Sequence, residues 1–173
     1  LHTAIHSFPT RRSSDLIDVA IYDVLGDVVC GGFSMPIREG FARDIYLICS
    51  GGFMSIYAAN NIARAVQRLA KRGDTGLAGL ICNSNGDEAF ERAVIPAFGE
   101  KLGTPFFRFV PRSPVIQACE LEESPVVVHA PGSAEAEIFR DLARAVMEND
   151  SRVIPTPVND LADLEEMYRQ HLA

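Results

Sequence analysis

The sequence "IDVAIYDVLGDVVCGG" fills residues 17–32 and places an apolar run directly before a loop of aspartates and glycines. Residues 17–24 are apolar and β-branched nearly throughout, which is typical of a strand that is covered on both faces. Asp23 lies at the end of this run, and Cys30 follows it in the loop. In α/β folds the ligands bind at the carboxyl ends of parallel strands. The stretch therefore predicts an α/β fold whose functional residues begin at this loop.

The remainder of the chain alternates short apolar runs with longer helical patterns. Further strands are expected at 44–50, 77–84 and 106–111, and helices at 53–73, 86–103, 135–150 and 160–173, with a shorter helical segment around Cys119. Pro96 is expected to kink the second of these helices. Strands that alternate with helices form right-handed βαβ units. The pattern predicts a doubly wound, mainly parallel sheet with helices on both faces.

Length, composition and charge limit the kinds of function that the chain can have. The chain has 173 residues and 47% hydrophobic residues, which is enough for one domain with an ordinary core. Its formal net charge of -7 and pI near 5.1 argue against binding to nucleic acid or to an anionic membrane surface. No run of apolar residues is long enough to span a bilayer, and no secretory leader is recognised. We therefore expect a cytoplasmic protein without nucleic-acid or membrane partners.

The first sixteen residues are expected to have a different origin from the rest. The sequence "HSFPTRRSSDL", at 6–16, is what a widely used sequencing adapter encodes when translated, and it has no apolar periodicity. The alternative is a genuine basic, serine-rich arm. We expect residues 1–16 to be a non-native leader and residues 17–173 to be the C-terminal part of a single domain.

The loop after the first run combines two chemistries. Asp23 and Gly26 form a DxxG pattern, in which the carboxylate can reach a magnesium-bound water and the glycine N–H can approach a phosphate. Taken by itself, DxxG is better explained as an ordinary turn. Cys30 is a soft metal ligand, and the adjacent Gly31 and Gly32 allow backbone amides to face cluster sulfides. One loop thus carries a candidate phosphate sensor and a candidate metal ligand.

The other three cysteines, Cys49, Cys82 and Cys119, are widely spaced and form no CxxC pair. This spacing suits neither a disulfide framework nor a self-contained zinc site. Cys49 and Cys82 end apolar runs, so they are expected to be buried small hydrophobic residues, as is Cys119. The four histidines are scattered and predict no metal site.

The sequence "DVLGDVVCGGFSMP", at 23–36, resembles the signature of the nitrogenase iron protein family. This family comprises dinitrogenase reductase and the ATP-dependent reductase subunits of dark-operative protochlorophyllide and chlorophyllide reductases. The resemblance runs from Ile17 essentially to the C-terminus, through "PIREG" (36–40), "YAANNI" (57–62), "GLICNS" (79–84), "KLGTPFFRFVPR" (101–112) and "RVIPTPV" (152–158).

The resemblance implies a P-loop NTPase-type fold and an ATP-gated electron carrier. In the family, two identical subunits hold one [4Fe-4S] cluster, and Cys30 matches a cluster ligand. Asp23 matches the switch aspartate that senses nucleotide, Asp27 the aspartate that activates water, and Gly26 the glycine that faces the phosphate. A movement at the phosphate could then be passed to the cluster loop.

The resemblance also implies a nucleotide site and partners. Asn83 matches a residue that contacts adenine, and its amide offers both a donor and an acceptor. Pro111, Arg112 and Gln117 match the segment that lines the base, although Arg112 without the resemblance would be read as a solvated loop charge. The expected partners are MgATP, a second copy of the chain, a heteromeric dinitrogenase-like catalytic component, and ferredoxin or flavodoxin as electron donor.

Several departures from the family bear on the reaction. The P-loop and the loop with the second cluster cysteine are absent from residues 1–173, so this chain alone is expected to be inactive. Gly52 and Phe53 stand where nitrogenase reductases usually have Glu-Met. Glu122 and Glu123 stand where those reductases usually have arginines. Glu135 stands where they commonly have a glutamine that helps to hold adenine. These differences keep open a reductase component for a tetrapyrrole or a sulfur compound.

Two other classes remain as alternatives. Partition and septum-positioning ATPases share the switch-bearing fold without a cluster, and often carry a basic C-terminal helix. Cys30 and the acidic sequence at 160–173 argue against them. An inert α/β fragment is the other alternative. Strand edges exposed by the missing half would make such a fragment prone to misfolding.

Overall fold

The computed structural model describes residues 18–24, 36–37, 39–71 and 74–172. Within them, three parallel strands form a sheet in the order β1-β2-β3, with β1 at Asp44–Cys49, β2 at Gly76–Asn83 and β3 at Phe107–Val110. The helices are α3 (Phe53–Ala70), α4 (Glu88–Leu102), α5 (Pro114–Leu121), α6 (Val126–His129), α7 (Ala134–Met147) and α8 (Leu161–Arg169). The predicted α/β class with a parallel sheet is confirmed.

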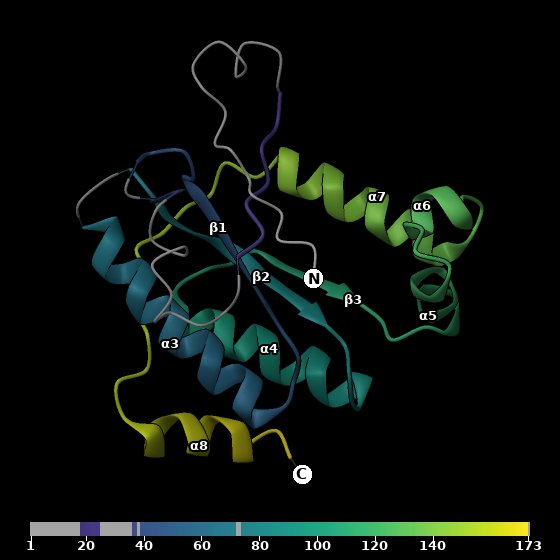
Figure 1. Ribbon diagram of the computed structural model, residues 1–173. Coiled ribbons are helices and arrows are strands. Elements are labelled where there is room, and N and C mark those ends of the chain that lie inside the picture. Colours follow the sequence, from purple (N-terminus) through teal and green to yellow (C-terminus); the bar gives the residue numbers. More distant parts are fainter. Residues whose placement is uncertain (1–17, 25–35, 38, 72–73, 173) are drawn as a thin grey trace, which may run out of the picture.

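The helices form layers on both faces of this sheet (Figure 1). α3 and α4 lie on one face, where α3 packs against β1 and β2, and α4 against β2 and β3. α8 lies outside α3 and α4 and contacts both, whereas α7 packs against β3 from the other face. This arrangement leaves the carboxyl ends of all three strands on one edge, because the strands are parallel.

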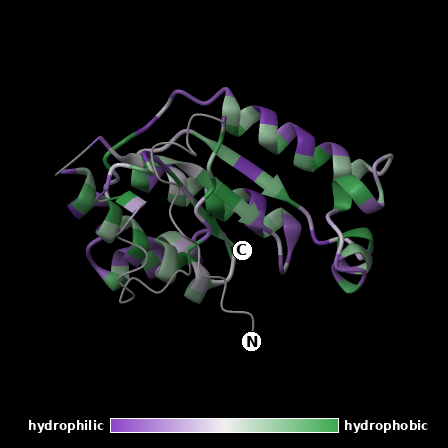
Figure 2. Ribbon diagram, turned by 45° about the horizontal axis from the view of Figure 1, so that its top comes forward, coloured by the Kyte–Doolittle hydropathy of each residue, from purple (hydrophilic) through white to green (hydrophobic). Residues whose placement is uncertain are grey.

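The core lies between the sheet and the helices α3 and α4. Every residue of β2 except Asn83 is buried, as expected for a central strand covered on both faces. The apolar strands therefore stand out at the centre of Figure 2. Burying a Leu, Ile or Phe side chain contributes roughly 1.5–3 kcal/mol each, and the largest fully buried apolar side chains are Phe98, Ile56, Leu77, Leu80, Ile95, Leu102 and Leu164.

Helix α3 carries a buried polar residue that fixes the segment after α7. Asn60 is 1% exposed, and its side-chain amide donates to the Val158 carbonyl at 2.8 Å. In return the Val158 amide donates to the Asn60 side-chain oxygen at 2.9 Å. Arg64 donates to the same carbonyl at 2.6 Å, and Gln67 donates to the Pro155 carbonyl at 3.0 Å. These bonds hold the segment at 155–158 against α3.

Helix α4 is bounded by strong local signals. Asp87 is its N-cap and accepts from the Phe90 amide at 2.8 Å, and Gly103 ends it with a left-handed φ of 83°. Pro96 lies inside the helix, which continues without interruption to Leu102. The predicted helix at 86–103 is therefore confirmed to within two residues of each end.

The strand predicted at 17–24 is not found in the described part of that run. Residues 18–24 adopt no regular secondary structure, and Ile21 is 88% exposed. An apolar run becomes a strand where a neighbouring strand completes its hydrogen-bond ladder. In the described part of the chain, β1 pairs with β2. The prediction for 17–24 rested on composition alone, and composition does not show whether a neighbouring strand is present.

Among the helices of the described residues, none is long and apolar enough to cross a bilayer.

Candidate functional site

The carboxyl ends of β2 and β3 bring two of the predicted nucleotide residues together. Asn83 is the last residue of β2 and pairs in register with Val110, the last residue of β3. The backbone amide of the next residue, Ser84, donates to the Val110 carbonyl at 2.9 Å, so the ends of the two strands stay adjacent. Pro111 comes directly after Val110 and therefore lies next to the exposed Asn83.

Beyond Pro111 the chain enters α5 through a polar cap. Ser113 is the N-cap of α5 and accepts from the Val115 amide at 3.1 Å. Its hydroxyl also donates to Glu135 in the first turn of α7, at 2.6 Å. This hydrogen bond holds the pKa of Glu135 below its usual range. Arg112 and Gln117 flank the cap with exposed side chains. Both side chains are accessible from solvent.

The predicted switch and cluster residues fall mostly outside the described residues. Asp23 is described and is exposed in the irregular segment at 18–24. The others lie outside that part of the chain: Gly26, Asp27, Cys30, Gly31 and Gly32. Their predicted roles therefore stay predictions.

The three described cysteines are buried, as predicted. Burial raises the pKa of Cys49 to about 12, and the neighbouring Cys82 and Glu91 add to the effect. Burial and Glu91 likewise raise the pKa of Cys82 to about 12, although Arg92 opposes this. A cluster takes thiolates as ligands, so neutral buried thiols do not fit one. Among the described residues no group of three Cys, His, Asp or Glu could hold a metal ion.

A residue that sequence analysis missed lies at the same edge of the sheet. Glu91, in the first turn of α4, is 1% exposed. Its Oε1 accepts from the Gly51 amide at 2.8 Å and from the Asn85 amide at 3.2 Å. An acidic residue in a first helical turn is normally explained by the helix dipole. The sequence signal that could have drawn attention to it is the Gly51-Gly52 pair after β1, because Gly51 leaves room for the Glu91 side chain.

The electrostatics of Glu91 reflect two opposing effects. Burial raises its pKa, but hydrogen bonds from Ser84 and from the amides of Gly51, Asn85 and Gly86 outweigh burial, so the net pKa is lowered. Oε2 has no well-aligned hydrogen-bond partner among the described residues, although the Ser84 hydroxyl and Gly86 amide stabilise the carboxylate. Glu91 is therefore a buried carboxylate that stays ionised at neutral pH.

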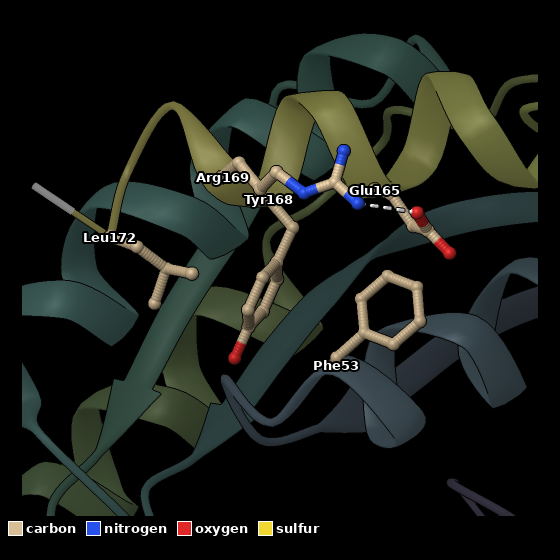
Figure 3. A pocket seen from close by; sticks show the side chains of 5 residues that line it. All are labelled: Phe53, Glu165, Tyr168, Arg169 and Leu172. Carbon is tan, nitrogen blue, oxygen red and sulfur yellow. Dashed lines mark hydrogen bonds and ion pairs between the residues drawn. The ribbon is translucent and has the colours of Figure 1, made fainter.

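A shallow pocket of about 250 Å³ lies beside the start of α3 (Figure 3). Aromatic side chains form its walls, with the rings of Phe53 and Tyr168 edge to face at 5.3 Å. An ion pair between Arg169 and Glu165 at 2.7 Å closes one side. The pocket is lined by Phe53, Glu165, Tyr168, Arg169 and Leu172, and none of the predicted site residues is among them. It does not support the predicted nucleotide site.

Comparison with protein families identifies a family that matches this chain. The family described as "4Fe-4S iron sulfur cluster binding proteins, NifH/frxC family" matches residues 2–172. The match covers nearly the whole chain, including both the described sheet and the loop that carries Cys30.

Proposed function

Because the chain belongs to the NifH/frxC family of 4Fe-4S iron–sulfur cluster binding proteins, we propose that it acts in ATP-dependent electron transfer. The family has a P-loop NTPase fold and consists of ATP-hydrolysing oxidoreductase components. Such a protein passes electrons to a catalytic partner and couples each transfer to MgATP hydrolysis, here in the cytoplasm. The observation that carries the proposal is the family match across residues 2–172.

The proposal gives the loop after Asp23 two tasks. When bound, the [4Fe-4S] cluster supplies a one-electron donor, and Cys30 would hold it together with cysteines from the rest of the homodimer. Asp23 and Gly26 would respond to the terminal phosphate, and Asp27 would orient and deprotonate the attacking water. Gly31 and Gly32 would leave the backbone amides open toward the cluster. Seven positions from Asp23 to Cys30 would connect the two tasks.

The nucleotide base would lie at the carboxyl edge of β2 and β3. The exposed amide of Asn83 can donate to and accept from a purine edge. Pro111 can contact the base face, and Arg112 and Gln117 offer donors from the start of α5. The support for this placement is that Asn83 and Pro111 adjoin through the register of β2 with β3.

The nature of the catalytic partner has a second candidate. Glu122 and Glu123 are exposed at the end of α5, and Glu123 has a positive φ of 49°. Carboxylates at positions that would carry arginines in nitrogenase reductases reverse the local charge, and complementary charge guides partner choice. The chain as the reductase component of a tetrapyrrole or sulfur-compound reductase is therefore the second candidate, beside a dinitrogenase as the catalytic partner.

The proposal is tested on the protein encoded by the gene including the sequence upstream of Ile17, where we place the P-loop and the second cluster cysteine. Purified without oxygen, the protein should contain about four irons per homodimer and show a reduced-state EPR signal that MgATP changes. The Cys30→Ala variant should lose both iron and signal, whereas Cys119→Ala should keep them. An iron-free ATPase that is indifferent to Cys30→Ala would assign the chain to the partition and septum-positioning class.

A further inference from the structure

The pairing of β1 with β2 ends at Cys49 and Cys82, and from there the two strands lead into different helices. One turns through residues 50–52 into α3, and the other turns through residues 84–86 into α4. We name these segments the β1 loop and the β2 loop. The Ser50 amide donates to the Ser55 hydroxyl at 2.9 Å, which ties the β1 loop to α3. No strand pairing holds the two loops to each other past the last ladder pair.

The Glu91 carboxylate supplies the missing connection. Its Oε1 accepts from Gly51 of the β1 loop at 2.8 Å and from Asn85 of the β2 loop at 3.2 Å. Hydrogen bonds from amides to a carboxylate are stronger than those to a neutral acceptor. The Ser84 backbone amide in turn donates to the Val110 carbonyl, at the end of β3, at 2.9 Å. A continuous lateral chain thus runs from the β1 loop through Glu91 and the β2 loop to β3.

The fit between Glu91 and Gly51 is tight. A Cβ added to Gly51 would overlap Glu91 Cγ, and would also press on Glu91 Cβ at 3.3 Å. Gly51 is buried in this position. The glycine is therefore needed for close approach of the β1 loop to the α4 side chain. A shift of either loop must move Glu91 or break a bond to it.

We propose that Glu91 is a positioning residue that makes the β1 and β2 loops move as one unit, so that a displacement of the β1 loop reaches Asn83. Asn83 comes directly before Ser84 in the chain. The functional consequence for nucleotide binding rests on the proposed function, but the coupling of the two loops does not. Glu91 touches no reacting atom in this account, and it acts through the backbone of its neighbours.

The first experiment follows backbone amides by NMR in the full chain. In the wild type, the Gly51 and Asn85 amide shifts should titrate together with one midpoint, since both donate to one carboxylate. Glu91→Gln should abolish this titration and speed hydrogen exchange at both amides by roughly tenfold to a hundredfold. Exchange at Leu47 and Ile81, in the strand interior, reports the change in global stability. Gly51 and Asn85 should exchange faster than this change accounts for, which separates positioning from a general loss of stability.

The matched control is Glu88→Gln. Glu88 lies in the same first turn of α4, but its side chain is 52% exposed and pairs with Arg92 at 2.8 Å. This variant should leave both amides as in the wild type. Separate titration midpoints for Gly51 and Asn85, or equal effects of the two substitutions, would overturn the proposal.

A second variant keeps the test decisive if Glu91→Gln does not fold. Gly51→Ala leaves the carboxylate intact but drives the β1 loop away from Glu91 Cγ. If the loops are coupled, the Asn85 amide in the other loop should also exchange several-fold faster. An Asn85 amide that exchanges at the wild-type rate in Gly51→Ala would contradict the coupling.

The last measurement links the loops to the nucleotide. In the protein expressed with the sequence upstream of Ile17, Glu91→Gln should weaken MgATP binding about fivefold or more, whereas Glu88→Gln should not. Unchanged MgATP affinity in Glu91→Gln would end the link to Asn83. If the wild type binds no MgATP, the proposed function fails, while the amide experiments still decide whether Glu91 couples the loops.

Discussion

At the scale of single residues, α4 contrasts two glutamates of the same first turn. Glu88 forms an exposed ion pair with Arg92, and exposed pairs of this kind contribute at most about 1 kcal/mol. Glu91 is buried and is held by backbone amides from two loops. The difference arises from their positions on the helix surface, because Glu88 faces solvent while Glu91 faces the strand ends.

The lowered pKa of Glu91 predicts an acid-sensitive fold. A carboxylate whose folded-state pKa is depressed contributes stability that is fully present above its ordinary value of 4.5, and this stability is lost as the pH falls toward the folded-state value. The neighbouring thiols of Cys49 and Cys82, with pKa values near 12, stay neutral over this range.

The measurement is the free energy of unfolding in urea between about pH 6 and about pH 3. The wild type should lose stability more steeply on the acid side than Glu91→Gln, which should be less stable by about 2–3 kcal/mol at neutral pH. Glu88→Gln should follow the wild-type slope. Parallel curves for the wild type and Glu91→Gln would show that Glu91 does not carry the acid dependence.

At the scale of elements, α5, α6 and α7 form a small unit beside β3 (Figure 1). Its own core consists of Cys119, Val126 and Ala136, separate from the main core between the sheet and α3 and α4. Few buried side chains hold this unit, and the hydrogen bond from Ser113 to Glu135 adds a polar contact between α5 and α7.

Ser113→Ala is predicted to loosen this unit in two ways. The loss of the N-cap should cost about 1 kcal/mol of helix stability. The loss of the hydroxyl that donates to Glu135 should let the pKa of Glu135 rise toward its ordinary value. Carboxyl chemical shifts followed against pH report the second effect directly, and Ser113→Thr, which keeps the hydroxyl, is the control. An unmoved Glu135 titration in Ser113→Ala would rule out the contact in solution.

The elements that could be predicted are those with local signals. The apolar run at 77–84 is β2 at 76–83, and the helix expected at 135–150 is α7, because composition and caps are properties of neighbouring residues. The run at 17–24 is equally apolar, yet 18–24 form no strand, because a ladder needs a partner far away in sequence. Glu91 was missed for the same reason, since its bond to Gly51 joins residues 40 positions apart.

At the scale of the whole molecule, the described part of the chain has one main core that continues to the edge where the predicted base-binding residues lie. Asn83 pairs in register with Val110, the residue before Pro111, so the two strand ends that carry Asn83 and Pro111 are adjacent. Their role in base binding stays a prediction. Their neighbourhood was predictable because parallel strands end at one edge of a sheet. The cluster side of the site depends on Cys30 and remains a prediction.

The burial of Cys49, Cys82 and Cys119 predicts slow reaction with alkylating agents. All three have at most 5% exposure, and the raised pKa values of Cys49 and Cys82 leave almost no thiolate at neutral pH. In the native protein, iodoacetamide should label these three at least a hundredfold more slowly than in urea, as mass spectrometry of the peptides would show. Rapid labelling of any of them without urea would contradict the packing described above.

The hydrogen bonds of Asn60 have a consequence for biosynthesis. Asn60 and its partner Val158 are 98 residues apart, so the ribosome makes α3 long before the backbone groups that satisfy this side chain. Until then a polar amide on the inner face of α3 must stay hydrated, which disfavours tight docking of that helix. Completion of the nascent core is thereby deferred until residues 155–158 have been released. A helper protein that recognises unfinished chains would find α3 accessible during this interval.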